Sequence, residues 1–474
     1  MGGPMRLLSS RILRMVVVTV ALAVGSVSMT TGVVVADPAP VPVQPPPPFP
    51  VPPLPPEFDP GFYSPPADVV ASKQPGEIIA AREVHLALYS VLPFNIDAWQ
   101  LSFRSTDHLG KPLAAVTTVM KPRGGDNGQP WNLLSYQFPV DSSARYCSAS
   151  YILQQASIPG AVLGQPAVPN EFLFPLTALG AGWVVNMPDF DGPNMAFGSG
   201  PLNGRITLDS VRAVENFQPV GLRGTGTKVA MAGYSGGSIA TGHAAELRSS
   251  YAPELNIVGA AEGGIAADLY AMVHMGNGNL GAGLFLSGVF GVAQEYPELG
   301  AYLDQHMNPI LRALRPVKNS LCLVWSAALV PFLPYEQMFD VPDPMHDPVP
   351  AQVFDAIRMG HSVPDMPMFM YNANPDWLVP VGPVNNLVDT YCRDPQARIR
   401  YTRDHFSEHF TLQYFAMAQE LVWLKDRFDG VPVAAGCDIR DEGSMLLDPK
   451  SWPAWLQAAG TLLAAAVQQP IGHH

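Results

Sequence analysis

A serine flanked by glycines, at the junction of a predicted strand and a predicted helix, constrains the fold of this chain most. Residues 233–237 read GYSGG, directly after an apolar run at residues 228–232 and directly before a helix-like stretch at residues 238–249. Such a serine sits on a strained turn, where larger flanking side chains would collide with the neighbouring strand and helix. Its hydroxyl then lies near helix amides that favour developing negative charge. The pattern predicts that Ser235 is a nucleophile; the alternative is a tight turn with an incidental serine.

Short apolar runs alternate with helix-like stretches along most of the chain. This alternation predicts an α/β fold with a mostly parallel central sheet covered by helices on both faces. We assign residues 67–265 and 366–430 to this core. Residues 266–365 interrupt this alternation with Gly-rich, Leu-rich and Pro-rich segments, and we expect an inserted helical cap there. The seven predicted strands are residues 114–120, 131–140, 183–187, 228–232, 257–261, 366–372 and 398–402.

A histidine and a carboxylate must accompany the serine, because a hydroxyl is a weak nucleophile unless a base takes its proton. Asp376 follows the predicted strand at residues 366–372. His409 follows the predicted strand at residues 398–402 and begins a long helix. This gives the order serine, acid, histidine. His405 is the alternative base and Asp268 the alternative acid.

His405 and His409 also have the i, i+4 spacing of two metal ligands. The HExxH glutamate and an obvious third ligand are missing, however. We therefore predict no metal site, and the acid–base chemistry above requires no cofactor.

The first 66 residues are typical of an export signal followed by a spacer. Residues 1–36 have arginines, then an apolar segment, then small residues that form a cleavage site after Ala36. This order predicts a signal peptide, with an uncleaved anchor as the alternative. Residues 37–66 contain fifteen of the fifty prolines, and we expect an extended tether outside the core. These features predict a protein that is secreted or held in the cell envelope.

The net charge and the cysteine content further limit the class of protein to which this chain can belong. The net charge of −13 argues against a nucleic-acid partner, because such binding needs a basic face. The hydrophobic share of 47% supplies enough material for a large buried core. The four cysteines, Cys147, Cys322, Cys392 and Cys437, are compatible with two disulfides in any of three pairings.

Several ordered segments resemble the secretory lipase family, α/β-hydrolases of the lipase A type. They are SYQFPVDSSARYC at residues 135–147, GYSGG, YAPELNIVGAAEGG at residues 251–264, PDWLVP at residues 375–380 and SEHF at residues 407–410. The resemblance implies Ser235 as nucleophile, Asp376 as acid and His409 as base. It also implies an oxyanion hole from the backbone amides of Asp141 and Gly236.

The resemblance further implies an α/β-hydrolase fold in which a helical cap over residues 266–365 encloses an acyl tunnel. Residues 431–474 would form a flap near its entrance. Disulfides would pair Cys147 with Cys322 and Cys392 with Cys437. The expected activity is that of a secreted serine carboxylic-ester hydrolase, a triacylglycerol lipase, with a lipid or ester substrate and transient contact with a lipid interface. The alternatives are an esterase or acyltransferase acting on envelope lipids, or a catalytically silent lipid-binding protein. None of these patterns addresses the oligomeric state.

Overall fold

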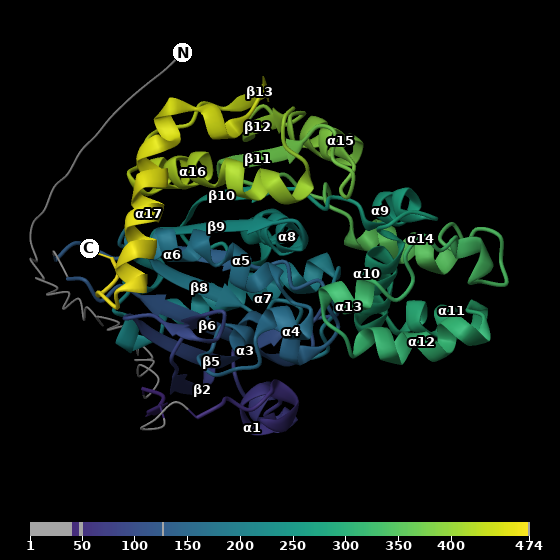
Figure 1. Ribbon diagram of the computed structural model, residues 1–474, viewed down its shortest axis with the longest axis horizontal. Coiled ribbons are helices and arrows are strands. Elements are labelled where there is room, and N and C mark those ends of the chain that lie inside the picture. The colour runs from purple at the N-terminus through teal and green to yellow at the C-terminus, as the bar shows by residue number, and fades with distance from the viewer. Residues whose placement is uncertain (1–39, 47–50, 126–127, 473–474) are drawn as a thin grey trace, which may run out of the picture. The chain divides into compact units, whose positions relative to one another are not determined.

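The computed structural model describes residues 40–46, 51–125 and 128–472, so the predicted signal peptide at residues 1–36 lies outside the described residues. A long sheet runs through the unit that begins at Val41. Within the described residues its strand order is β1-β2-β5-β6-β8-β7-β9-β10-β11-β12-β13 (Figure 1). The strands are β1 (Val43–Gln44), β2 (Ile78–Glu83), β5 (Asp97–Thr106), β6 (Pro112–Lys121), β7 (Leu133–Gln137), β8 (Val184–Pro188), β9 (Val229–Tyr234), β10 (Ile257–Gly263), β11 (Met368–Ala373), β12 (Arg398–Asp404) and β13 (Gly436–Glu442), and a separate ribbon pairs β3 (Ala87–Leu88) with β4 (Leu92–Pro93).

The sheet is mostly parallel, as the sequence predicts. From β8 through β7 to β13, every neighbouring pair of strands is parallel. Within this sheet, the described antiparallel pairs are confined to β2, β5, β6 and β8. The seven predicted strands correspond to β6 through β12. The carboxyl ends of the parallel strands therefore meet at one edge, where open α/β sheets bind ligands.

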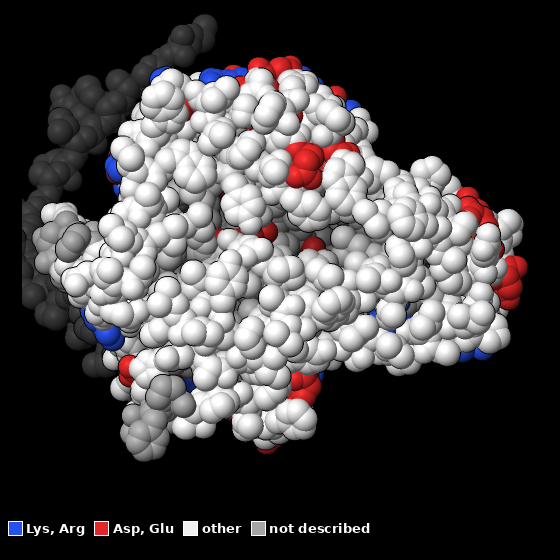
Figure 2. All heavy atoms as spheres, viewed as in Figure 1, with Lys and Arg blue, Asp and Glu red and all other residues white. Residues whose placement is uncertain are grey.

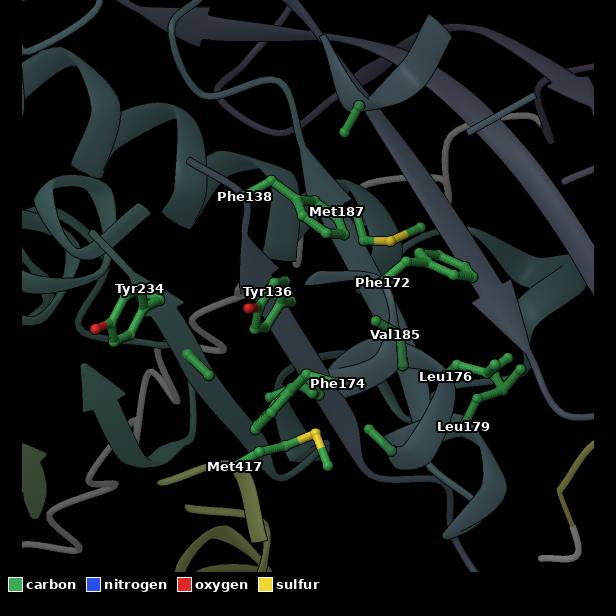
Figure 3. Close-up of a cluster of buried hydrophobic side chains, with 14 of the residues drawn as sticks. Tyr136, Phe138, Phe172, Phe174, Leu176, Leu179, Val185, Met187, Tyr234 and Met417 are labelled. Carbon is green, nitrogen blue, oxygen red and sulfur yellow. The ribbon is translucent and has the colours of Figure 1, made fainter. Parts of the chain in front are cut away.

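Helices cover both faces of the sheet, and alternate residues of one strand pack against different helices. Ala230 and Ala232 of β9 belong to one buried cluster, whereas Val229 and Met231 belong to the other. The first cluster includes aromatic residues Tyr136, Phe138, Phe172 and Phe174 (Figure 3). Its helices include α3 (Ala149–Ile152), α6 (Leu173–Gly180), α16 (His409–Phe428) and α17 (Trp452–Ala466); those of the second include α7 (Gly200–Glu215), α8 (Gly236–Tyr251) and α15 (Val381–Tyr391).

The expected cap region is helical and has its own apolar cluster. Phe285, Val289 and Phe290 of α10 belong to this cluster, and α10 packs against neighbouring helices of the same region. Figure 1 shows these helices beside the sheet. They are α9 (Leu269–Gly276), α10 (Ala282–Glu295), α11 (Pro297–His306), α12 (Pro309–Asn319), α13 (Leu323–Ala327) and α14 (Pro348–Ile357). The remaining helices are α1 (Pro60–Tyr63), α2 (Ala67–Ala71), α4 (Gly160–Leu163) and α5 (Ala167–Glu171).

The proline-rich segment differs from the expected free tether. Val43 pairs with Ala81 as part of a parallel edge strand. Further along, Phe62 and Tyr63 are buried, and Asp59 forms a 2.5 Å ion pair with Arg82. Proline lacks an N–H group but can lie at a sheet edge, where one side of the strand needs no partner. The aromatic side chains then supply the apolar burial that holds the segment against the core.

Two disulfides join distant parts of the chain in the pairing that the family resemblance implies. Cys147, in a short 3-10 helix (Arg145–Cys147) after β7, is bonded to Cys322 at the start of α13 in the cap. Cys392, after α15, is bonded to Cys437 in the edge strand β13. Across the residues that the structure describes, none of the helices has the length and apolar character needed to cross a bilayer.

Several carboxyl groups are buried without a cation beside them. Burial raises the pKa of Glu262 to about 8, with a further contribution from Glu246, and neither Glu262 oxygen has a hydrogen-bond partner. Burial also raises the pKa of Glu420 to about 8 and that of Asp189 to about 7. The folded state therefore holds these protons at pH values where the unfolded chain has lost them.

This proton balance predicts that stability falls as the pH rises from about 4.5 to about 8, because the folded state binds more protons over that window. Glu262→Gln should remove one such contribution. We expect a gain on the order of 2 kcal/mol in the free energy of unfolding at pH 7 and almost none at pH 4.5. Urea denaturation at both pH values measures it, with the exposed Glu298→Gln as the control. An equal gain at both pH values would contradict this account.

Candidate active site

Ser235 lies on a strained turn between β9 and α8. Its φ angle is +53°, a value that non-glycine residues seldom adopt. Its N–H group donates to the carbonyl of Gly263 at 2.9 Å, which ties the turn to the neighbouring strand β10. Ser235 is also the N-cap residue of α8. The hydroxyl is thus held at the amino end of a helix, as the GYSGG pattern predicts.

Backbone crowding explains why glycines flank this serine. A Cβ atom on Gly237 would lie 2.0 Å from the carbonyl oxygen of Gln137, at the end of β7. A Cβ atom on Gly233 would lie 2.4 Å from the Thr241 hydroxyl and 2.6 Å from the Gly237 carbonyl oxygen. Neither position has room for a side chain, so the close approach of strand and helix depends on both glycines.

His409 and Asp376 complete a continuous chain of hydrogen bonds with the serine. Ser235 Oγ and His409 Nε2 are 2.8 Å apart. His409 Nδ1 and Asp376 Oδ2 are also 2.8 Å apart. The other carboxylate oxygen of Asp376 accepts from the N–H groups of Leu378 and Val379, at 2.9 and 2.8 Å. The three predicted residues therefore have the geometry of a nucleophile, a base and an orienting acid.

The start of α16 positions the histidine. His409 is the first residue of the helix and is only 1% exposed. Glu408 precedes it and forms a capping box with Thr411, in which each side chain accepts a hydrogen bond from the backbone N–H of the other residue. The Tyr234 hydroxyl donates to the His409 carbonyl. These contacts set the direction in which the imidazole points.

His405, the alternative base, and Asp268, the alternative acid, do not belong to this hydrogen-bond chain. The His405 ring is 2.8 Å from Asp441 on the edge strand β13 and 3.1 Å from the carbonyl of Asn374. Asp268 caps α9 by accepting from the N–H of Ala271 at 3.2 Å. Both therefore have structural partners and do not contact Ser235.

Asp141 and Gly236, the residues expected to supply oxyanion amides, meet beside Ser235. Asp141 has a φ angle of +49°, and a Cβ atom on Gly236 would lie 1.7 Å from its carboxylate oxygen. Burial raises the pKa of Asp141 to about 7, against the opposing effect of His409. Because Gly236 begins α8, its N–H is one of the free amides at the helix start, which suits a developing negative charge.

A cavity of about 660 Å³ opens over the serine. Figure 2 shows a hollow in the face of the molecule with acidic residues inside it and no Lys or Arg beside them. Two kinds of wall enclose the cavity. The cap contributes apolar residues, namely Leu280, Gly281, Leu284, Leu323, Val324, Ala327, Ala328, Pro331 and Phe332, and the core contributes Pro139, Asp141, Pro166, Ala167, Asn170, Glu171, Tyr234, Ser235, Trp377, Leu378, His409, Phe410, Gln413 and Tyr414.

Some of these lining residues could not be predicted from local patterns. Asn170 and Glu171 lie in a short helix that carries no recognisable motif. Gln413 follows His409 by four residues, and that helical spacing could have indicated a shared face. Of the described residues after Tyr414, none lines this cavity. The expected flap at residues 431–474 instead adds β13 to the sheet edge and packs α17 against α6 and α16.

Fold and site together define an α/β-hydrolase, with a serine at a strand-to-helix turn and an inserted helical region above the sheet. Comparison with known proteins narrows this class. Residues 163–436 match the family model described as "Secretory lipase". The chain is 32% identical over 431 residues to "Lipase A" of Arthroderma benhamiae, covering 89% of this chain and 90% of that protein. The chain therefore belongs to the secretory lipase family.

Two further proteins are similar to this chain. A protein of Mycobacterium tuberculosis named "Probable inactive lipase MT1628" is 36% identical over 383 residues, covering 80% of this chain and 84% of that protein. The crystal structure of Candida antarctica lipase A matches with a TM-score of 0.78 and 26% identity, covering 89% of this chain and 98% of that one. The predicted family and α/β-hydrolase fold are confirmed.

The crowding around the Ser235 turn predicts that one added methyl group lowers the free energy of unfolding. Gly237→Ala should lower the free energy of unfolding by at least about 2 kcal/mol, because the Gln137 carbonyl cannot move without disturbing β7. Gly382→Ala in α15, where a Cβ atom meets nothing within 4 Å, is the matched control. It should leave stability unchanged or raise it slightly. Equal effects of the two substitutions, measured by urea denaturation, would show that the turn is not crowded.

Proposed function

We propose that this chain is a secreted serine carboxylic-ester hydrolase, a triacylglycerol lipase that works through an acyl-serine intermediate. The observation that carries the proposal is the Ser235–His409–Asp376 hydrogen-bond chain, with 2.8 Å at both contacts to the histidine, at the floor of an apolar cavity. The hydrogen-bond chain supplies an activated nucleophile, and the cavity supplies room for an acyl chain beside it. Hydrolysis of a lipid ester needs both in one place.

The geometry supports a two-step reaction. Ser235 attacks the ester carbonyl while His409 takes its proton, and Asp376 holds the imidazole in the required tautomer. The amides of Asp141 and Gly236 would stabilise the oxyanion of the tetrahedral intermediate. His409 then gives its proton to the departing alcohol. A water molecule, activated by the same histidine, releases the acid and restores the serine.

The cap wall supports a lipid ester as the substrate class. Leu284, Val324 and Phe332 belong to an uncharged, apolar wall facing the serine. At the rim, Trp377 and Phe410 are 43% and 56% exposed, which suits contact with a lipid surface. A hydrocarbon chain would replace water along this wall, and that burial supplies binding free energy in proportion to chain length.

Family membership and the two disulfides support secretion. Disulfides persist in oxidising compartments, and one of them joins the oxyanion loop to the cap. The N-terminal leader expected from the sequence is consistent with the same location.

A catalytically silent lipid-binding protein is the second candidate, because one relative is named an inactive lipase. The intact hydrogen-bond chain favours the enzyme. Turnover distinguishes the two, since a silent protein would bind an ester without hydrolysing it.

Substitution of the three residues tests the proposal. Ser235→Ala and His409→Ala should each lower kcat on p-nitrophenyl octanoate by about 10⁴-fold or more, because members of such a triad act as a unit. His405→Ala, which removes a histidine that does not contact the serine, should retain activity near the wild-type value. Circular dichroism verifies the fold of each variant. If His405→Ala lost activity and His409→Ala retained it, His405 and not His409 would be the base.

A further inference from the structure

A second cavity, with a volume of about 630 Å³, lies apart from the cavity over Ser235. Among the described residues, the two cavities have no lining residue in common. Three separate parts of the chain contribute to its wall, namely the proline-rich segment at Glu57 and Phe58, the loop at residues 143–146, and the cap at residues 319–320. Its volume falls in the range of small-molecule sites, roughly 300–1,000 Å³. The proposed lipase chemistry does not use this cavity.

Direct bonds hold these three parts of the chain together. A Glu57 carboxylate oxygen accepts from the N–H group of Tyr146 at 3.2 Å, which joins the proline-rich segment to the loop. The Tyr146 hydroxyl donates to the carbonyl of Ser320, which joins the loop to the cap. The Cys147–Cys322 disulfide also links these two segments. The wall is therefore preformed, and a ligand need not assemble it.

Much of the lining is apolar. Tyr151 and Met195 are each only 2% exposed, whereas Phe58 and Ile158 are 72% and 45% exposed. A hydrocarbon chain lying along Phe58 and Ile158 would remove apolar surface from water, and that burial supplies binding free energy. Exposed apolar side chains that border one cavity indicate an apolar ligand.

Arg145 supplies a positive charge at this cavity. Of the described residues that line it, Arg145 is the cation and Glu57 the anion. The Arg145 guanidinium donates to the Ser64 hydroxyl at 2.8 Å, and it forms no ion pair with a described carboxylate. Burial lowers the pKa of Arg145, against the opposing effect of Glu57. A half-buried cation with a neutral partner keeps N–H groups that a carboxylate can accept from in a bidentate pair.

Two neighbours of Arg145 decide the sign of the charge that fits. The Ser143 hydroxyl oxygen is buried and has no hydrogen-bond partner among the described residues, so it is a second donor on the same loop. Glu57 is exposed, so solvent screens its charge and weakens its repulsion of an anion. The donors at this cavity therefore favour an anionic head group.

We propose that this second cavity binds a fatty-acid anion, with its carboxylate paired to Arg145 and its hydrocarbon chain along Phe58 and Ile158. A neutral lipid would leave the cation without a counter-charge. An inorganic anion would leave the apolar lining in water. The site goes beyond the proposed function and does not require it.

Titration with decanoate at neutral pH, below its micelle concentration, tests the proposal. The protein is first treated with an alkyl fluorophosphonate, which would occupy the cavity over Ser235. Calorimetry should then show one bound decanoate per chain. Decanol, which has the same hydrocarbon chain and no charge, should bind at least about tenfold more weakly, because a charge-assisted pair is lost.

Variants of the two charged residues locate the bound decanoate. Arg145→Met, similar in length, should weaken binding by about tenfold or more, whereas Arg145→Lys, which keeps the charge, should retain most of the affinity. Glu57→Gln removes a like charge and should tighten binding by about threefold. Arg223→Met is the matched control, because Arg223 is also half-buried and does not line the cavity. Circular dichroism verifies the fold of each variant.

These results together would support the site. The proposal is overturned if the treated protein binds no decanoate, or if Arg145→Met loses no more affinity than Arg223→Met or Arg145→Lys. Unchanged or weaker binding in Glu57→Gln overturns the anionic head group. A folded protein that does not react with the fluorophosphonate counts against the proposed function alone, because the Arg145 variants still locate the decanoate.

Discussion

The strained turn at Ser235 is the constraint on which the rest of the structure depends. Its positive φ angle is tolerated because β9, β7 and α8 approach so closely that only glycine fits at positions 233 and 237. That approach requires a parallel sheet whose strands end together. The ends of β11 and β12 then bring Asp376 and His409 to the same edge, although 141 and 174 residues separate them from the serine. The hydrogen-bond chain is thus a consequence of sheet topology as much as of the three side chains.

The cap depends on the same edge of the sheet. Its insertion follows β10, and the Cys147–Cys322 disulfide joins it back to the loop that carries Asp141. Two parts of the chain that enclose the cavity are therefore linked covalently. The cavity is lined by apolar residues of the cap and by core residues that include Asn170, Glu171 and Gln413. No Lys or Arg of the described residues lines this cavity, which agrees with the small charged share of the chain, 14%.

Much of the central fold could be predicted from the sequence, because buried parallel strands are continuous apolar runs with a clear boundary. The edge strands could not. Strand β5 alternates polar and apolar residues, and β13, with the sequence GCDIRDE, is largely exposed and charged. Proline content predicts a free N-terminal segment, but aromatic residues at positions 62 and 63 anchor it. At the site, GYSGG and the residue order indicate Ser235, Asp376 and His409. Glu171 carries no local signal, because its position depends on how α5 packs beside the serine.

Active-site labelling tests the central claim most directly. A fluorophosphonate reacts with a serine only when a neighbouring base and oxyanion donors activate it. Incubation of the intact protein followed by mass spectrometry should show one adduct per chain, located by peptide mapping at Ser235 and absent from Ser235→Ala. A folded protein that stays unmodified, or that is modified at another serine, would contradict the assignment of an activated nucleophile to this turn.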